Sequence, residues 1–306
     1  MPVIEARGVR KTYRRRGKPP KAALDGLDLV VDEGGVHGFL GPNGSGKTTM
    51  LRCLLGLARA DTGDMRVLGQ QIPHSLPAVI GDIGVLLESP AFFPPFTARL
   101  NLQLLATAAE IPHTQVGAVL DVVQLTDAAD ERVKGYSLGM RQRLGIAAAM
   151  LKQPSVLILD EPSNGLDPAG MREVRQLLRA LGDSGVTVLL SSHLLGEVQQ
   201  ICDTVTIINH GRVVTSGPVD EVLKSQSTGA LAVGVADAPR ALEVLVTAGF
   251  AARIQDGHIL VDRVEDGAVV ARALADAQLY PSWLMPQQVD LEQAFLAITA
   301  DEGGVA

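Results

Sequence analysis

A glycine-rich segment at residues 41–49 has the spacing of a phosphate-binding loop. Its sequence, GPNGSGKTT, fits the pattern G-x-x-x-x-G-K-[ST]. The apolar run before it, 36–40, predicts a buried strand, and 49–55 predicts a helix. The glycines allow the backbone to curl around an anion, so that its N–H groups and the positive helix end point at phosphates. Lys47 would add a positive charge at the terminal phosphates, and Thr48 a hydroxyl for Mg²⁺. We therefore predict nucleotide contacts from Gly41, Pro42, Asn43, Gly44, Ser45, Gly46, Lys47, Thr48 and Thr49.

Two adjacent carboxylates, Asp160 and Glu161, follow a second apolar run at 155–159. Neighbouring side chains of a strand point to opposite sides, so we expect Asp160 to face a metal ion and Glu161 to face a water beyond the γ-phosphate. His193 follows another apolar run, 186–191. Because ligands of parallel sheets bind outside the carboxyl ends of the strands, we predict that His193 contacts the γ-phosphate.

Tyr13, Ser137 and Gly139 are further candidates for nucleotide contacts. Tyr13 ends an alternating run at 3–13 and can lie flat on an adenine ring; the alternative is a half-buried strand aromatic. Ser137 is a candidate N-cap for a helix that continues through Leu151. A helix N-terminus with serine and glycine is a second potential phosphate site.

The elements that must position these residues alternate between strands and helices. The patterns predict strands at 65–69, 83–87, 205–209 and 212–216, a strand at 27–31 that precedes the glycine-rich segment, and helices at 97–109, 114–124 and 169–181. The Phe- and Pro-rich stretch 89–96 cannot be a helix. Between the predicted strands at 3–13 and 27–31, the basic stretch at 14–21 is typical of a solvated hairpin tip. The alternative is that it binds acidic lipid headgroups.

A polar linker at 225–230 separates a second region with its own strands and helices. The order of its segments fits a split βαβ arrangement and ends in a predicted helix at 290–299. It contains no catalytic constellation, so we expect it to be regulatory or to contact a partner.

Composition and charge exclude some classes of protein. The net charge of −7 argues against a nucleic-acid partner, which would require a basic face. Cys53 and Cys202 lie in apolar helical contexts, which favours buried thiols in a reducing compartment. No stretch reaches the roughly 18 apolar residues of a membrane span, so we expect that this chain does not cross a bilayer by itself.

The motifs of roughly the first 220 residues, taken in this order, resemble the ATP-binding subunit of an ABC transporter. Residues 41–48 match Walker A, residues 156–161 match Walker B, and residues 164–167 match the D-loop with Asp167. Tyr13 and His193 occupy the positions of the adenine-stacking aromatic and the switch histidine.

Two departures from the family pattern resemble one subgroup. Ser137-Leu138-Gly139-Met140 looks like the signature Ser-Gly-Gly-Gln but differs at Leu138 and Met140, and Glu88 occupies the position of a glutamine. Together with the extra C-terminal domain, these differences resemble the antibiotic and drug exporters related to bacitracin and daunorubicin transporters.

The resemblance implies an α/β fold of the P-loop NTPase class, with a mainly parallel sheet, an antiparallel β subdomain and a helical subdomain. The ATP-binding domain would span 1–224, with the helical subdomain at about 89–153. The linker at 225–230 would lead to a small accessory α+β domain at 231–306.

The resemblance also implies the chemistry and the partners. ATP would bind with Mg²⁺ held by Thr48, Asp160 and Glu88, and Lys47, Glu161 and His193 would be catalytic. Two copies, or one copy and a closely related ATPase subunit, would pair head to tail, with Ser137 and Gly139 of one closing the phosphate loop of the other. Asp167 of the D-loop would also contact the nucleotide. A separate polytopic permease would hold the subunit at the cytoplasmic face of the membrane, contacted by the Phe-rich loop. The cargo would be a drug, an antibiotic or a lipid-like compound.

Other functions remain as alternatives at this point. A soluble ABC-type ATPase with a regulatory role, or one associated with ribosomes or DNA, is disfavoured by the acidic charge, the single cassette and the lack of coiled-coil insertions. An importer ATPase is a second alternative, against which the signature departures argue. Glu88 either ligates Mg²⁺ through water or caps its loop.

Overall fold

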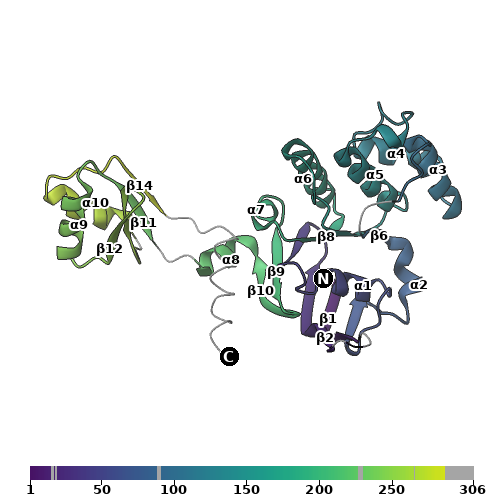
Figure 1. Cartoon of the computed structure of the whole chain (residues 1–306), viewed down its shortest axis with the longest axis horizontal. Coiled ribbons are helices and arrows are strands. Elements are labelled where there is room, and N and C mark those ends of the chain that lie inside the picture. The colour runs from purple at the N-terminus through teal and green to yellow at the C-terminus, as the bar shows by residue number, and fades with distance from the viewer. Residues whose placement is uncertain (15–16, 18, 88–90, 227–229, 265, 287–306) are drawn as a thin grey trace. The chain divides into compact units, whose positions relative to one another are not determined.

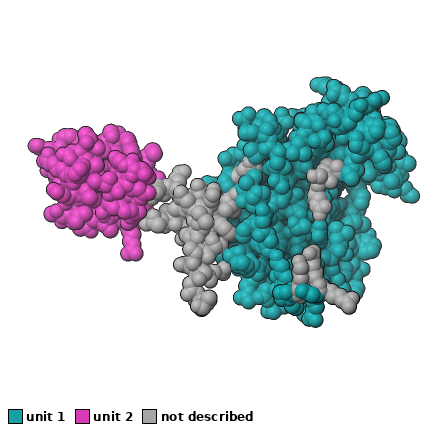
Figure 2. Space-filling view, in the orientation of Figure 1, with its two compact units in different colours: residues 1–219, 301–306 teal, residues 220–300 magenta. Residues whose placement is uncertain are grey.

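The chain divides into two compact units in the computed structural model, residues 1–219 and residues 220–300 (Figure 2). The structure describes residues 1–14, 17, 19–87, 91–226, 230–264 and 266–286. Glu88 and the predicted helix at 290–299 therefore lie outside the described residues.

A six-stranded sheet forms the centre of the first unit, in the order β10-β9-β3-β8-β7-β6. All neighbouring strands run parallel except β10 and β9, which form the expected hairpin. Every residue of β3, β7 and β8 is buried, as expected for strands covered on both faces. The strands are β3 (Val36–Leu40), β6 (Ile83–Leu86), β7 (Val156–Asp160), β8 (Thr187–Ser192), β9 (Thr204–Asn209) and β10 (Arg212–Pro218).

One central strand, β3, contains a buried histidine. The Nδ1 of His37 lies 2.7 Å from Thr204 Oγ1 and its Nε2 lies 3.0 Å from Thr206 Oγ1, so both ring nitrogens have hydroxyl partners on β9. Burial lowers the pKa of His37 from 6.5 to about 4. The imidazole is therefore neutral at pH 7, and one nitrogen donates while the other accepts.

A second, antiparallel sheet with the order β2-β1-β4-β5 packs on the first. Its strands are β1 (Pro2–Tyr13), β2 (Lys21–Asp32), β4 (Thr62–Val67) and β5 (Gln70–Gln71). Strand β2 begins earlier than the predicted 27–31, because its first residues pair with the end of β1, placing Lys21 opposite Tyr13. A single hydrophobic cluster includes side chains of this sheet, of β3 and of the intervening helix α1 (Lys47–Leu54).

Three packed helices form a separate group near the β6 end of the central sheet (Figure 1). They are α3 (Ala98–Ala108), α4 (Thr114–Val122) and α5 (Leu138–Met150), close to the predicted bounds. The first unit also contains the long helix α6 (Pro168–Asp183) and two single-turn helices, α2 (Leu76–Val79) and α7 (Leu195–Val198). Helix α8 (Val219–Gln226) follows them in the chain.

The described part of the Phe-rich stretch, 91–96, is not helical, as predicted. Buried Asn101 holds it: its Oδ1 accepts from Phe93 N–H at 2.8 Å, and its Nδ2 donates to Phe93 O at 3.2 Å. The rings of Phe93 and Phe96 lie 5.5 Å apart and are 60% and 39% exposed. The backbone is thus fixed while two aromatic rings face solvent.

The second unit has the predicted split βαβ arrangement. Its antiparallel sheet has the order β12-β13-β11-β14, and helices α9 and α10 pack against the sheet through one apolar cluster. The elements are β11 (Leu231–Gly234), α9 (Ala238–Thr247), β12 (Ala252–Gln255), β13 (His258–Val261), α10 (Gly267–Asp276) and β14 (Trp283–Pro286).

The two cysteines and the hydropathy of the helices can be compared with the expectations from composition. Cys53 and Cys202 are free and buried, and burial raises the pKa of both thiols. Among the helices that the structure describes, none combines the length and hydropathy that a bilayer span requires.

Candidate nucleotide-binding site

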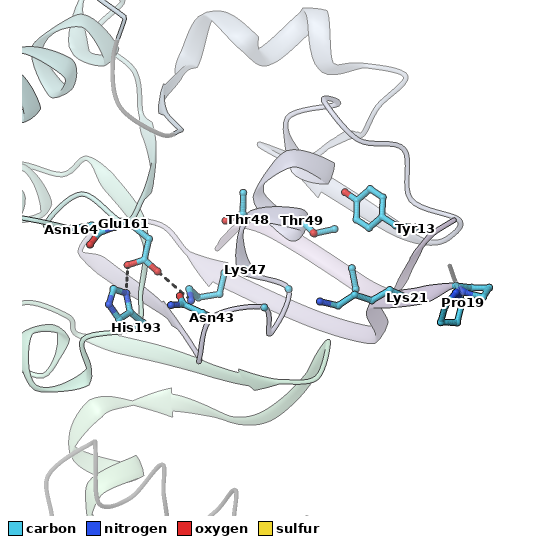
Figure 3. A pocket seen from close by; sticks show the side chains of 14 residues that line it. Tyr13, Pro19, Lys21, Asn43, Lys47, Thr48, Thr49, Glu161, Asn164 and His193 are labelled. Atoms are coloured by element: carbon cyan, nitrogen blue, oxygen red, sulfur yellow. Dashed lines mark hydrogen bonds and ion pairs between the residues drawn. The ribbon is translucent and has the colours of Figure 1, made fainter. Parts of the chain in front are cut away.

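A cavity of about 900 Å³ lies where β3, β7 and β8 end. It brings together residues that the sequence predicts as nucleotide contacts from four separate segments (Figure 3). The lining residues are Tyr13, Pro19, Pro20, Lys21, Ala23, Asn43, Gly44, Gly46, Lys47, Thr48, Thr49, Glu161, Asn164 and His193.

The loop between β3 and α1 has a backbone that glycine alone accommodates well. Gly44 and Gly46 have φ of 83° and 117°, in the left-handed region that disfavours other residues. A Cβ on Gly46 would lie 2.5 Å from Ala23 O. Gly46 is also the N-cap of α1 and supplies no side-chain cap. No side chain therefore caps the first turn of α1, and its positive end faces the cavity.

Lys47 is almost completely buried at the start of α1. Its Nζ donates to Gly41 O at 2.7 Å and to Pro42 O at 3.4 Å, and lies 3.2 Å from Glu161 Oε1. The ammonium group is therefore held at the end of the loop that adjoins the tip of β7.

The side-chain oxygens of Thr48 and Asp160, the predicted metal ligands, lie next to each other. Thr48 Oγ1 donates to Asp160 Oδ2 at 2.8 Å. The hydroxyl of Ser191 donates to the other carboxylate oxygen, Oδ1. Ser191 was not predicted as a site residue; its only sequence signal is a hydroxyl near the end of β8, and the register that places it opposite Asp160 is tertiary.

Glu161 does not follow the strand alternation that the sequence suggests. Strand β7 ends at Asp160, and Glu161 has φ of 51°, so its carboxylate turns toward the same loop. Ser191 holds this conformation by accepting the Glu161 N–H with Oγ at 3.1 Å and with its carbonyl at 3.2 Å. Strained backbone of this kind, in a non-glycine residue, concentrates at functional sites.

The carboxylate of Glu161 connects two other predicted residues. Its Oε1 faces Lys47 Nζ, and its Oε2 lies 2.7 Å from Nδ1 of half-buried His193. Carboxylate, imidazole and ammonium groups thus converge at the end of the cavity away from Tyr13 (Figure 3).

Tyr13 lies at the opposite end of the cavity and is 39% exposed. The Lys11 ammonium lies 5.5 Å from its ring centroid and is itself held by Arg59 O at 2.6 Å. A cation at this distance from an aromatic ring is attracted to it. Tyr13 is therefore an ordered aromatic wall of the cavity.

Ser137, Gly139 and Asp167 do not line this cavity. They lie in a second one of about 490 Å³, lined by Ser137, Leu138, Gly139, Met140, Arg143, Gly165, Asp167, Ala169, Gly170 and Glu173. As predicted, Ser137 caps α5, accepting the Met140 N–H at 3.2 Å. Asp167 caps α6 in the same way, accepting from Gly170 N–H at 3.1 Å.

Comparisons with known proteins agree on one family. The family model described as "ABC transporter" matches residues 24–164. The chain is 37% identical to the daunorubicin resistance ATP-binding protein DrrA3 of Streptomyces coeruleorubidus, over 92% of each chain. It is 40% identical to the bacitracin transport ATP-binding protein BcrA of Bacillus licheniformis, over 66% of this chain and 67% of that one. Its fold is similar to a dimeric ATP-binding cassette bound to ADP and Pi, with a TM-score of 0.62, 24% identity, and coverage of 70% of this chain and 98% of the other.

Proposed function

Because this chain belongs to the ATP-binding proteins of ABC transporters and is thus an ATP hydrolase, we propose that it drives an exporter by hydrolysing ATP in the cavity described above. The main support for this proposal is that the side chains of Lys47 and His193 both contact the carboxylate of Glu161 at the carboxyl end of the parallel sheet. A nucleotide with its base on Tyr13 would place its terminal phosphate near this group.

The loop residues suit the phosphate chain. The left-handed glycines and the uncapped start of α1 leave backbone N–H groups for phosphate oxygens. Asn43, Gly44, Gly46 and Thr49 line the cavity and would contact the chain of phosphates, with Lys47 neutralising the terminal ones. The other predicted contacts of this loop, Gly41, Pro42 and Ser45, are not among the lining residues, and we assign them to the support of the loop.

The donor set of Thr48 and Asp160 fits Mg²⁺, which prefers oxygen ligands and binds through one or two carboxylates together with substrate phosphates. Within the described residues there is no cluster of three or more His, Cys, Asp or Glu side chains suited to a metal ion. Thr48 and Asp160 would hold the ion, with Glu88, outside the described residues, as a further candidate ligand. When bound, the ion would neutralise charge on the phosphates.

Phosphoryl transfer to water depends on positioning and on charge neutralisation. In this proposal Glu161 accepts a proton from the attacking water or orients it. His193 holds Oε2 of that carboxylate and contacts the γ-phosphate, and Lys47 neutralises the terminal phosphates.

We assign Ser137, Gly139 and Asp167 to the nucleotide site of a second subunit, either another copy or a closely related ATPase. Their position in a cavity apart from the loop, Glu161 and His193 supports this assignment. Two ATP molecules would then lie between two subunits placed head to tail. Closure of the pair would move the permease, and hydrolysis would reset it.

A separate polytopic permease would hold the subunit at the cytoplasmic face of the membrane. The exposed rings of Phe93 and Phe96, on a loop held by Asn101, support a protein contact there. The names of the similar proteins, which refer to bacitracin transport and daunorubicin resistance, support an antibiotic or a drug as cargo. A lipid-like compound is a further candidate cargo. In this scheme residues 1–224 are the ATP-binding domain, with its helical subdomain at about 89–153, residues 225–230 the linker, and residues 231–306 an accessory domain.

The substitution Glu161→Gln tests the site most directly. It keeps the shape of the side chain but removes the charge that accepts a proton, so kcat should fall by about 100-fold or more while ATP still binds. Binding by calorimetry and phosphate release under saturating ATP measure the two quantities separately.

The matched control is Glu243→Gln on the exposed side of α9, which should leave both quantities unchanged. Turnover in Glu161→Gln equal to that of the unaltered protein would contradict the proposed role of Glu161. Failure of the unaltered protein to bind ATP would contradict the proposed site as a whole.

A further inference from the structure

A second lysine faces the nucleotide cavity and has no role in the scheme above. Lys21, the first residue of β2, lies directly opposite Tyr13 in the antiparallel pair β1–β2. Directly paired residues project from the same face of a sheet, so the register places the ammonium group beside the aromatic wall. Figure 3 shows the Lys21 side chain pointing toward the loop from the side of Tyr13.

The Lys21 ammonium reaches the middle of the loop. Its Nζ lies 3.8 Å from the position that a Cβ on Gly44 would occupy. In the part of the chain that the structure describes, this ammonium forms no ion pair and no side-chain hydrogen bond. It is thus a cation that lines an anion-binding cavity without an anionic partner in the described protein.

Among the residues that the structure describes, the two lysines that line the cavity occupy different ends of the loop. Lys47 is bound to the carbonyls of Gly41 and Pro42 and to Glu161, whereas Lys21 lies at Gly44, on the side of Tyr13. A nucleotide that extends from Tyr13 to Glu161 would pass Lys21 before it reaches Lys47. The phosphates near Lys21 are then those closer to the sugar.

We propose that Lys21 binds the α- and β-phosphates of the nucleotide and so contributes to the affinity for ATP and ADP alike. This inference rests on the proposed function, because it takes the cavity as the nucleotide site. Lys21 is a binding residue in this scheme and takes no part in the attack on the γ-phosphate. Its side chain is exposed, so the contribution is that of a screened surface charge.

The test compares the affinities of the full chain for Mg²⁺-ADP and for a non-hydrolysable ATP analogue. Lys21→Ala should weaken the binding of both ligands by the same factor, about 2- to 5-fold at low salt. The loss should shrink at about 0.5 M salt because the exposed charge is screened. Lys21→Arg keeps the charge and should restore most of the affinity for both ligands.

Lys152→Ala is the matched control, since this exposed lysine lies outside the cavity and donates to Ile80 O. Equal affinities in Lys21→Ala and the unaltered protein would overturn the proposal for Lys21 and leave the proposed function intact. A loss confined to the ATP analogue would overturn it as well, because Lys21 would then act at the γ-phosphate. If the unaltered protein binds neither ligand, the proposed function itself is wrong, and the inference falls with it.

Discussion

Helices α1 and α5 both begin with glycine-rich sequence, but their first turns are completed differently. Gly46, the N-cap of α1, has no side chain, whereas Ser137 caps α5 by accepting the Met140 N–H. The start of α1 also has Lys47 beside it and opens into the larger cavity. The N–H groups of the first turn of α1 are therefore free for an anion beside a buried lysine, whereas Ser137 already satisfies one of those of α5.

The largest effect on stability is expected from a substitution at the start of α1. Gly46→Ala adds a Cβ that would lie 2.5 Å from Ala23 O, at a φ of 117°. Overpacking of this kind costs about 1–3 kcal/mol, and the backbone strain adds to it. We expect Tm to fall by about 5 °C or more and nucleotide affinity to fall at least tenfold. Thermal unfolding followed by circular dichroism, with calorimetry of ADP binding, measures both. An unchanged Tm would show that the loop can move away from Ala23.

A second effect on stability depends on pH, reaches its full size only near pH 4, and concerns the strand that leads to α1. The pKa of His37 is about 4 in the folded protein and 6.5 in the unfolded chain, so the unfolded chain binds the extra proton first. The free energy of unfolding should therefore fall as pH decreases from about 6.5 to 4, by about 3 kcal/mol from this residue. Helix α5 contains no histidine and has no such dependence of its own.

Urea unfolding at pH 7.5, 6 and 5 measures the His37 contribution. The variant His37→Gln keeps a donor and an acceptor for the two threonines but does not titrate. Each protein gives a slope of the free energy of unfolding against pH. The difference between the two slopes is the contribution of His37, because the carboxylates contribute equally to both. Identical slopes would mean that the imidazole is hydrated in the folded state.

The smallest effect on stability is expected at the start of α5. A Cβ on Gly139 would meet only Gly170 Cα at 3.6 Å and Ser137 Oγ at 3.9 Å, which are ordinary contacts. Gly139→Ala should leave Tm unchanged or slightly raised, because alanine favours the helix. In the proposed pair of subunits, however, it should weaken the rise of ATPase rate per subunit with protein concentration. Rates measured against concentration, with and without the permease in liposomes, provide the test. An unaltered concentration dependence would remove Gly139 from the proposed interface.

Local patterns predicted most of the elements. The all-apolar strands β3, β7 and β8, the loop between β3 and α1, and the Ser137 cap agree with the structure, because each depends on residues close in sequence. The start of β2 was misplaced because its first residues are recruited by pairing with β1 rather than by their own hydrophobic pattern. The same pairing brings Lys21 into the cavity, although by sequence it belongs to a basic hairpin tip.

The chemical groups, the order of the strands and helices, and the family can all be recognised from local sequence patterns. The direction in which Glu161 points, and the contact that holds it, depend instead on tertiary structure. That orientation depends on the register between β7 and β8, which sets Ser191 opposite Asp160 and lets it accept the Glu161 N–H. Register between distant strands arises from the packing of the whole sheet, since a shift by one residue would turn every side chain of the strand to the other face.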